Sequence, residues 1–232
     1  MVLGYANNAS LHLKAKTKMR KVVLIIMVIC TCFILFVAYQ YRTLFTRTTS
    51  KALHEKQTNT VDTLLLHKLK KQSKKINSYA IAHHNNTEIC FLIDMSLHCG
   101  KNRFFVYNMQ KDSIELAGLV AHGSGSKKFA QTPTFSNEVS SGCTSLGKYK
   151  ISYQYKGKFG KAYKLIGLDS SNSKAFDRSV VLHAYSCVPN NEPYPLPICN
   201  SLGCPMVSYT FLEALHPIIA TSKRPILLYI FR

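Results

Sequence analysis

Two short stretches of this sequence place a cysteine after a glycine and a serine, residue types that suit a thiol nucleophile in a tight turn. "SSGC" occupies residues 140–143 and "SLGC" occupies residues 201–204. In both, a histidine (His122 and His183, respectively) lies 21 positions before the cysteine. A cysteine attacks a carbonyl as its thiolate, and a nearby imidazole can remove the thiol proton. The pattern therefore predicts acyl transfer or hydrolysis through one of the two cysteines.

Cys204 is the better candidate of the two. Its histidine, His183, lies in the apolar run "SVVLHAYS" at 179–186, which is typical of a buried strand and would hold the imidazole rigidly. A helix is expected to begin shortly after Cys204, and its free N–H groups and dipole would favour a thiolate. Gly203 permits a tight turn, and its amide and that of Cys204 could form an oxyanion hole. Cys143 instead precedes a strand, and a disulfide cysteine in a glycine turn is the alternative for Cys204.

Alternating and apolar runs predict a mostly β domain that would position these groups. The expected strands cover residues 89–96, 103–109, 114–123, 147–155, 160–168, 179–186 and 224–231. Segments rich in Gly, Ser, Asn and Pro separate them, as turns require. One clear helical stretch lies at 208–220, where Ser208 can cap the start and Pro217 should kink or split the helix.

The N-terminal part carries most of the positive charge. The chain has a formal net charge of +19, and residues 1–78 hold fourteen Lys/Arg against two Asp/Glu. Residues 22–39 are uncharged and long enough to cross a bilayer. More basic residues precede this run than follow it, and no signal-peptide cleavage site follows it, so we expect an uncleaved signal anchor over 22–40. The basic tail at 1–21 would be cytoplasmic and the rest extracytoplasmic, and a buried core helix is the alternative for the run.

Residues 41–78 are expected to form a stalk or linker helix before a domain at 79–232. Leucines at positions 64, 65, 66 and 69 can share one face of this helix above a basic face. Such a helix could lie on anionic lipid head groups, or it could be a solvated linker. No zinc finger, recognition helix or aromatic–basic interleaving is present, so we expect no nucleic-acid partner.

The cysteines outside the predicted span leave several pairings open. Cys187 and Cys199 bracket a proline-rich loop and could be joined by a disulfide, whereas Cys90 and Cys99 flank the first hairpin. An extracytoplasmic location permits such bonds, but spacing does not give their connectivity. The domain has no C-x-x-C or H-x-x-x-H pair, so a zinc site is not expected. The absence of D-x-D weakens a metal-dependent glycosyltransferase.

An ordered set of short motifs carries a family resemblance. "LIDMS", "KNRFFVYNM", "VAHGSGS", "FSN", "TSLGKY", "VVLHA" and "SLGCP" follow one another between residues 92 and 205. Together they resemble the YkuD-like L,D-transpeptidase catalytic domain, and more closely its murein branch, over about residues 85–232. The sequence departs from better-known members at Leu202, where many have histidine or arginine, and at Pro205, which no Arg or Asn soon follows. Those side chains assist substrate binding in the family, so its donor preference is not transferred to this chain.

The resemblance implies a β-sandwich or barrel with one C-terminal helix and a cysteine-dependent acyl transfer on peptidoglycan stem peptides. Cys204 would attack the carbonyl of the third residue of a tetrapeptide stem and release the terminal D-alanine, leaving a thioester. An amine of a second stem would then form a 3–3 crosslink, whereas water would make the enzyme an L,D-carboxypeptidase. His183 would act as base and then as acid, oriented by Ser201, and Gly203 would complete the catalytic turn.

The resemblance also implies a substrate pocket with His122, Gly123 and Tyr185, and no metal or organic cofactor. A satisfied loop histidine is the alternative for His122, and simple packing is the alternative for Tyr185. With the predicted anchor, the catalytic domain would face the periplasm of a bacterium. Two other readings remain open, a non-catalytic murein-binding or scaffold domain and a eukaryotic receptor stalk glycosylated at "NNT" (85–87).

Overall fold

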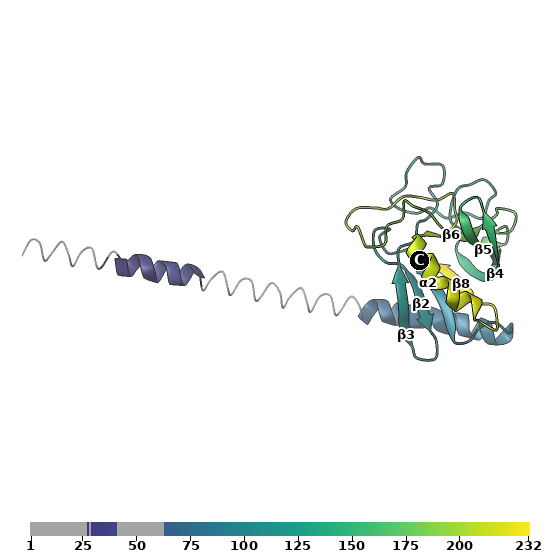
Figure 1. Cartoon of the computed structure of the whole chain (residues 1–232), viewed down its shortest axis with the longest axis horizontal. Helices are drawn as coiled ribbons and strands as arrows, with labels where there is room; N and C mark the ends of the chain where they lie inside the picture. The colour runs from purple at the N-terminus through teal and green to yellow at the C-terminus, as the bar shows by residue number, and fades with distance from the viewer. Residues whose placement is uncertain (1–26, 28, 41–62) are drawn as a thin grey trace, which may run out of the picture. The chain divides into compact units, whose positions relative to one another are not determined.

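The computed structural model of the chain describes residue 27 and residues 29–40 and 63–232, which fall into two compact units divided between Asp62 and Thr63 (Figure 1). In the first unit, residues 29–40 are helical. The predicted cytoplasmic tail at 1–21, part of the predicted anchor and residues 41–62 lie outside the described residues. Within the described part of the chain, no helix combines the length and the apolar character that a membrane crossing needs.

The second unit is built on one eight-stranded sheet with the order β3-β2-β1-β8-β4-β5-β6-β7. The strands are β1 (Ile89–Asp94), β2 (Phe104–Asn108), β3 (Ser113–Gly118), β4 (Gly147–Gly157), β5 (Gly160–Gly167), β6 (Val181–Ala184), β7 (Met206–Val207) and β8 (Leu227–Phe231). A short 3-10 helix, η1 (Ser170–Asn172), precedes β6, and α2 (Tyr209–Ala220) precedes β8. The last strand, β8, pairs in parallel with β1 and antiparallel with β4, so the end of the chain forms the centre of the sheet.

The mostly β fold with a C-terminal helix is confirmed. Each of the seven expected strands is present within a few residues of its predicted range, and only the two-residue β7 was missed. Ser208 caps α2 by accepting a hydrogen bond from the amide of Phe211 at 3.2 Å. Of the two predicted effects of Pro217, a kink or a split, the split does not occur, because α2 continues to Ala220 and the Pro217 carbonyl accepts from the Thr221 amide at 3.0 Å.

Both faces of the sheet are covered, because successive side chains of a strand point to opposite faces. In β1, Phe91 and Ile93 belong to the core on the α2 side, where Leu212 and Leu215 of α2 are buried. Cys90 and Leu92 belong to a second core on the opposite face, which the helix over residues 63–82 covers (Figure 1). A helix therefore packs on each side of the sheet.

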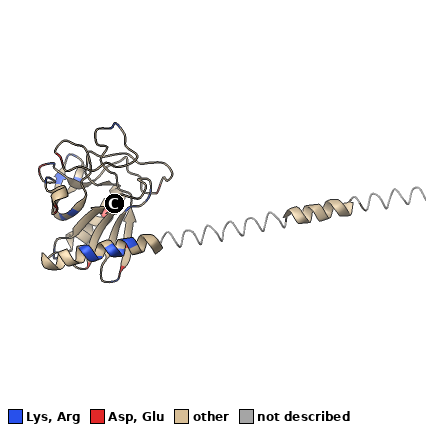
Figure 2. Cartoon of the chain, turned by 180° about the vertical axis from the view of Figure 1, so that it is seen from behind, with Lys and Arg blue, Asp and Glu red and all other residues tan. Residues whose placement is uncertain are grey.

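The helix over residues 63–82 corrects the predicted domain boundary at residue 79. Leu69, Ile76 and Ala80 are fully buried against the sheet, and Lys68 Nζ lies 2.8 Å from the carboxylate of the buried Asp94. The predicted leucine face is therefore an intramolecular packing surface, although Leu64 remains 65% exposed. Figure 2 shows the lysine positions along this helix in blue, and all of them except Lys68 are exposed. The compact unit begins at Thr63.

Two long connections carry the motifs "VAHGSGS", "FSN" and "SLGCP" and lie at the loop-rich end of the sheet in Figure 1. They span residues 119–146, between β3 and β4, and residues 185–205, between β6 and β7. The two connections are joined by the bridge between Gly123 and Ser201. Within the second, Cys187 and Cys199 form a disulfide, as the sequence suggested.

Candidate functional site

A cavity of about 530 Å³ opens among these loops and holds the predicted nucleophile and its base. Its lining comes from the first long connection, the turn between β4 and β5, the end of β6 and the segment before β7. The lining residues are Ser124, Lys128, Phe129, Phe159, His183, Tyr185, Cys199, Asn200, Ser201, Leu202, Cys204 and Met206. The structure thus brings His183 and Cys204 to one cavity, together with Ser201 and Tyr185.

His183 is held rigidly on β6, between Ala162 of β5 and Met206 of β7 in the sheet. Its side chain is buried, and its Nδ1 lies 3.1 Å from the carbonyl oxygen of Ala184. A carbonyl only accepts hydrogen bonds, so Nδ1 carries the proton and Nε2 keeps its lone pair. Burial lowers the pKa of His183, which keeps the imidazole neutral and able to accept a proton.

Cys204 is a free, partly exposed cysteine whose thiol points to a carbonyl. Its Sγ lies 3.9 Å from the Ser179 oxygen, a contact in which the thiol donates. Burial raises the pKa of Cys204, while the positive charges of Arg178 and Lys164 act in the opposite direction. The cysteine is therefore a thiol in the resting site. The positive charges of Arg178 and Lys164 would stabilise the thiolate once the proton has been removed.

The turn before Cys204 is shaped by Gly203 and Ser201. Gly203 has a φ of +114°, and a Cβ placed there would lie 2.6 Å from the Cys143 carbonyl oxygen, so only glycine fits without a shift. The Ser201 hydroxyl donates to the Cys204 carbonyl at 2.6 Å and accepts from the Gly203 amide at 3.1 Å. These bonds hold the turn closed and fix the position of the cysteine backbone.

Ser201 was expected to orient His183, but its hydroxyl and its carbonyl both bond to other residues. The Ser201 carbonyl accepts from the Ser124 amide at 3.0 Å, and its hydroxyl is used within the turn. The group that orients His183 is the Ala184 carbonyl, the next residue along the same strand. A backbone group of this kind leaves no signal in the sequence.

His122 and Gly123 do not line the cavity, contrary to expectation. His122 is fully buried, its Nδ1 accepts from the Arg103 guanidinium at 2.9 Å, and its Nε2 donates to the Ala130 carbonyl at 3.0 Å. Burial and the neighbouring Arg103 lower the pKa of His122 to about 4. The amide of Gly123 donates to Thr144 Oγ1 at 2.9 Å. Both residues support the loops behind the site, and the satisfied-histidine alternative describes His122.

Cys143, in the first Ser-x-Gly-Cys copy, supports the second copy. Its side chain is buried beside Thr134, and its carbonyl lies against Gly203 and accepts from Arg178 Nη2. The Arg178 guanidinium also donates to the Ser136 carbonyl at 2.8 Å. The two tetrapeptides therefore meet in space, with Arg178 bonded to the first and lying beside Gly203 of the second, which their equal spacing from a histidine did not predict.

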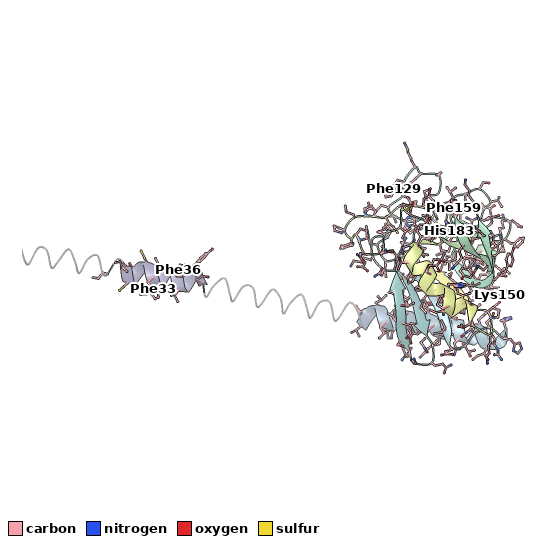
Figure 3. The ribbon with its side chains drawn as sticks, viewed as in Figure 1. Phe33, Phe36, Phe129, Lys150, Phe159 and His183 are labelled. Carbon is pink, nitrogen blue, oxygen red and sulfur yellow. A yellow bond between two sulfur atoms is a disulfide. The ribbon has the colours of Figure 1, made fainter. Side chains whose placement is uncertain are left out.

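Several residues around the cavity were missed by sequence reasoning. Phe159 lies in the turn between β4 and β5, and Phe129 lies in the first long connection; Figure 3 labels both near His183. The glycines on either side of Lys158 and Phe159 indicated a turn, but nothing in the sequence indicated that this turn reaches β6. In the part of the chain that the structure describes, no group of three or more His, Cys, Asp or Glu is arranged to hold a metal ion.

The sequence matches a known class of protein. The L,D-transpeptidase catalytic domain model matches residues 59–231, and this chain belongs to that family. No curated protein matches the sequence.

Solved structures with a similar fold include an L,D-transpeptidase from Xylanimonas cellulosilytica, with 14% identity, a TM-score of 0.37 and coverage of 66% of this chain and 68% of that one. An L,D-transpeptidase from Mycobacterium smegmatis has 11% identity, a TM-score of 0.38 and coverage of 62% and 59%. The helical cell shape determining protein from Campylobacter jejuni has 10% identity, a TM-score of 0.40 and coverage of 62% and 47%. This chain thus spans about half to two thirds of the lengths of these relatives.

Proposed function

We propose that this protein is a cysteine acyltransferase that acts on peptidoglycan stem peptides and forms 3–3 crosslinks. The observation that carries the proposal is the shared cavity of His183 and Cys204, in which the imidazole has a free Nε2 and the cysteine is not in a disulfide. Membership of the L,D-transpeptidase family supports peptidoglycan as the substrate. A disulfide-bonded Cys204 would have favoured a binding or scaffold role, and this bond is not present.

In the first half-reaction, His183 Nε2 takes the proton of the Cys204 thiol as Sγ attacks the carbonyl carbon of the third stem residue. The tetrahedral intermediate carries a negative oxygen. The amide of Gly203 already donates to Ser201, so we assign the oxyanion contact to the Cys204 amide. Collapse of the intermediate breaks the peptide bond, and the D-alanine amine leaves with the proton from His183. A thioester on Cys204 remains.

In the second half-reaction, an amine of another stem attacks the thioester and gives its proton to His183. The C–S bond breaks, and the thiolate recovers the proton from the imidazolium. Attack by water would release a tripeptide instead. Because Cys204 rests as a thiol and His183 as a neutral imidazole, proton transfer and attack are expected to be coupled.

The location of the reaction is part of the proposal. We infer that residues 22–40 anchor the chain in the inner membrane and that the domain faces the periplasm, because the run is uncharged and has more basic residues before it than after it. The eukaryotic alternative is disfavoured, since the Asn85 side chain is buried and donates to the His83 carbonyl at 3.2 Å. Fractionation of the native host cells tests the anchor: recovery of the chain in a carbonate wash would contradict it.

The activity is tested by incubating the purified full chain, in detergent, with a disaccharide-tetrapeptide and following muropeptides and protein mass together. A crosslinked dimer and an acyl adduct, both lost in Cys204→Ala and kept in Cys143→Ala, are expected. A tripeptide as the only product would identify a carboxypeptidase. Neither product nor adduct from the unmutated chain would overturn the enzyme proposal in favour of a binding role.

A further inference from the structure

The turn between β4 and β5 places an aromatic ring on the predicted base. The ring of Phe159 stacks on the His183 imidazole, with a centroid separation of 4.9 Å and an interplanar angle of 21°. The same ring meets Tyr185 edge-on at 5.6 Å and 89°. Figure 3 labels Phe159 and His183 at the loop-rich end of the domain. All three rings line the cavity of Cys204.

Phe159 is poorly placed to be an ordinary core residue. Its side chain is 42% exposed, and the neighbouring Gly160 has a φ of +83° with open space where a Cβ would be. The turn therefore projects from the sheet, and the stacked rings of the site are its main aromatic contacts. A single exposed phenylalanine is ordinary on a protein surface, but the ring of Phe159 is held in one place by its stack on His183.

The two contacts of His183 restrict different motions. The hydrogen bond from Nδ1 to Ala184 fixes the tautomer, while a stack against one face fixes the plane of the ring. We propose that Phe159 is a positioning residue for the reaction proposed above: its stack holds the plane of the His183 imidazole and keeps water from one face of it. The inference depends on that proposed function for its catalytic meaning, but the contact itself can be tested separately.

The surroundings of His183 indicate in which direction its pKa should change when the Phe159 ring is removed. Burial is the main cause of its lowered pKa. The ionisable groups around the ring and the cavity are Lys158 on the same turn, whose amine lies 5.7 Å from the Phe159 ring, together with Tyr185, Cys204 and Lys128. Arg178 and Lys164 also act on Cys204 through their positive charges. None of these is a carboxylate that would stabilise an imidazolium. Removing Phe159 exposes the imidazole and should therefore raise the pKa of His183.

The test is an NMR titration of the His183 imidazole in the full chain, with its signal assigned by its loss in His183→Gln. Phe159→Ala should move the titration midpoint to higher pH, and Phe159→Tyr, which keeps the stack, should restore it. Tyr153→Ala is the matched control, because Tyr153 is an exposed aromatic of the same hairpin that packs near Tyr155 instead. An unchanged midpoint in Phe159→Ala, or an equal shift in Tyr153→Ala, would overturn the inference.

Turnover provides the second measurement. Phe159→Ala should lower kcat by about tenfold to a hundredfold with a smaller change in KM, since a misplaced catalytic group costs about that much. The acidic limb of its pH profile should move to higher pH, because the base must be neutral. If the unmutated chain lacks turnover but the titration shifts, the proposed function fails and the Phe159 contact stands. If Phe159→Ala alters turnover but does not shift the His183 titration, the inference about Phe159 is overturned while the proposed function stands.

Discussion

Cys204 and His183 have pKa values displaced in opposite directions, and both displacements favour the neutral form. Burial raises the pKa of the thiol and lowers that of the imidazole. The resting site is therefore a thiol and an imidazole rather than an ion pair. Arg178 and Lys164 offset part of this preference by stabilising the thiolate. A reactive anion would then form mainly when a substrate is present to be attacked.

The contribution of Arg178 is tested by the pH dependence of Cys204 alkylation. Because the pKa of Cys204 is raised, the rate with iodoacetamide should keep increasing at a pH where an ordinary exposed cysteine has levelled off. Arg178→Gln removes a cation that lowers the pKa of Cys204, so the pH profile of alkylation should move to still higher pH in this variant. The rate near neutral pH should fall several-fold, since one pKa unit is about a factor of ten in thiolate.

Two further variants separate charge from packing in that experiment. Arg178→Lys retains the charge and should keep most of the rate. Lys174→Gln removes a cation of the same segment whose amine pairs with Glu138 at the surface, and it should leave the profile unchanged. A normal profile in Arg178→Gln would show that its charge does not reach the thiol.

At the scale of elements, the turn that carries Cys204 depends on the loop that carries the other Ser-x-Gly-Cys copy. The backbone of Cys143 occupies the space where a side chain at position 203 would lie. The hydroxyl of Thr144, the residue after Cys143, lies 3.4 Å from the Gly203 carbonyl and links the two turns. The turn is thus fixed by contacts between segments distant in sequence.

Gly203→Ala should therefore disturb the site far more than a comparable change elsewhere. Gly160→Ala is a close control, because Gly160 also has a positive φ but no atom within 4 Å of its virtual Cβ. We expect Gly160→Ala to cost about 1 kcal/mol from backbone strain alone. Gly203→Ala should lower the thermal midpoint further and slow Cys204 alkylation. Equal effects of the two changes on both measurements would contradict this account.

The helix over residues 63–82 is an integral part of the folded unit, and its two sides should respond differently to mutation. Leu69→Ala removes a fully buried side chain and should lower the free energy of unfolding by about 2–5 kcal/mol. Leu64→Ala, at a 65% exposed position, should change it by less than about 0.5 kcal/mol. Urea denaturation measures both. Similar small losses would indicate that the helix is a detached stalk.

At the scale of the whole molecule, buried His122 links the first long connection to the sheet through Arg103 and makes stability depend on pH. The pKa of His122 is about 4 in the folded chain against an ordinary 6.5, so the unfolded chain binds a proton first as the pH falls. Stability is then complete above about pH 6.5 and falls toward pH 4, by up to about 3 kcal/mol. His183 acts in the same direction.

The measurement is the urea midpoint at several pH values between 6.5 and 4. His122→Gln should flatten its decrease, because an amide can bond to both neighbours but does not titrate. His67→Gln, at an exposed position of the helix over residues 63–82, should keep the decrease of the unmutated chain. If the urea midpoint falls equally steeply with decreasing pH in His122→Gln and in the unmutated chain, other groups cause the pH dependence.

The sequence by itself determined the strand order along the chain, the C-terminal helix and the pair Cys204 and His183. Local patterns carry that information: alternation along a strand, a serine cap, and a glycine before a cysteine. It also indicated the family, because several motifs occur in a fixed order. The leucines at 65 and 69 were recognised as one face of a helix, but their partner was not.

Only the tertiary structure decided which groups surround that pair. The Ala184 carbonyl that orients His183 has no side-chain signal, and Phe159 reaches the imidazole only because β5 pairs with β6. His122 and His183 each lie 21 positions before a Ser-x-Gly-Cys cysteine, yet loop packing buries one behind the site and leaves the other in the cavity. Contacts between distant segments depend on how the sheet folds the chain back, and local periodicity does not encode them.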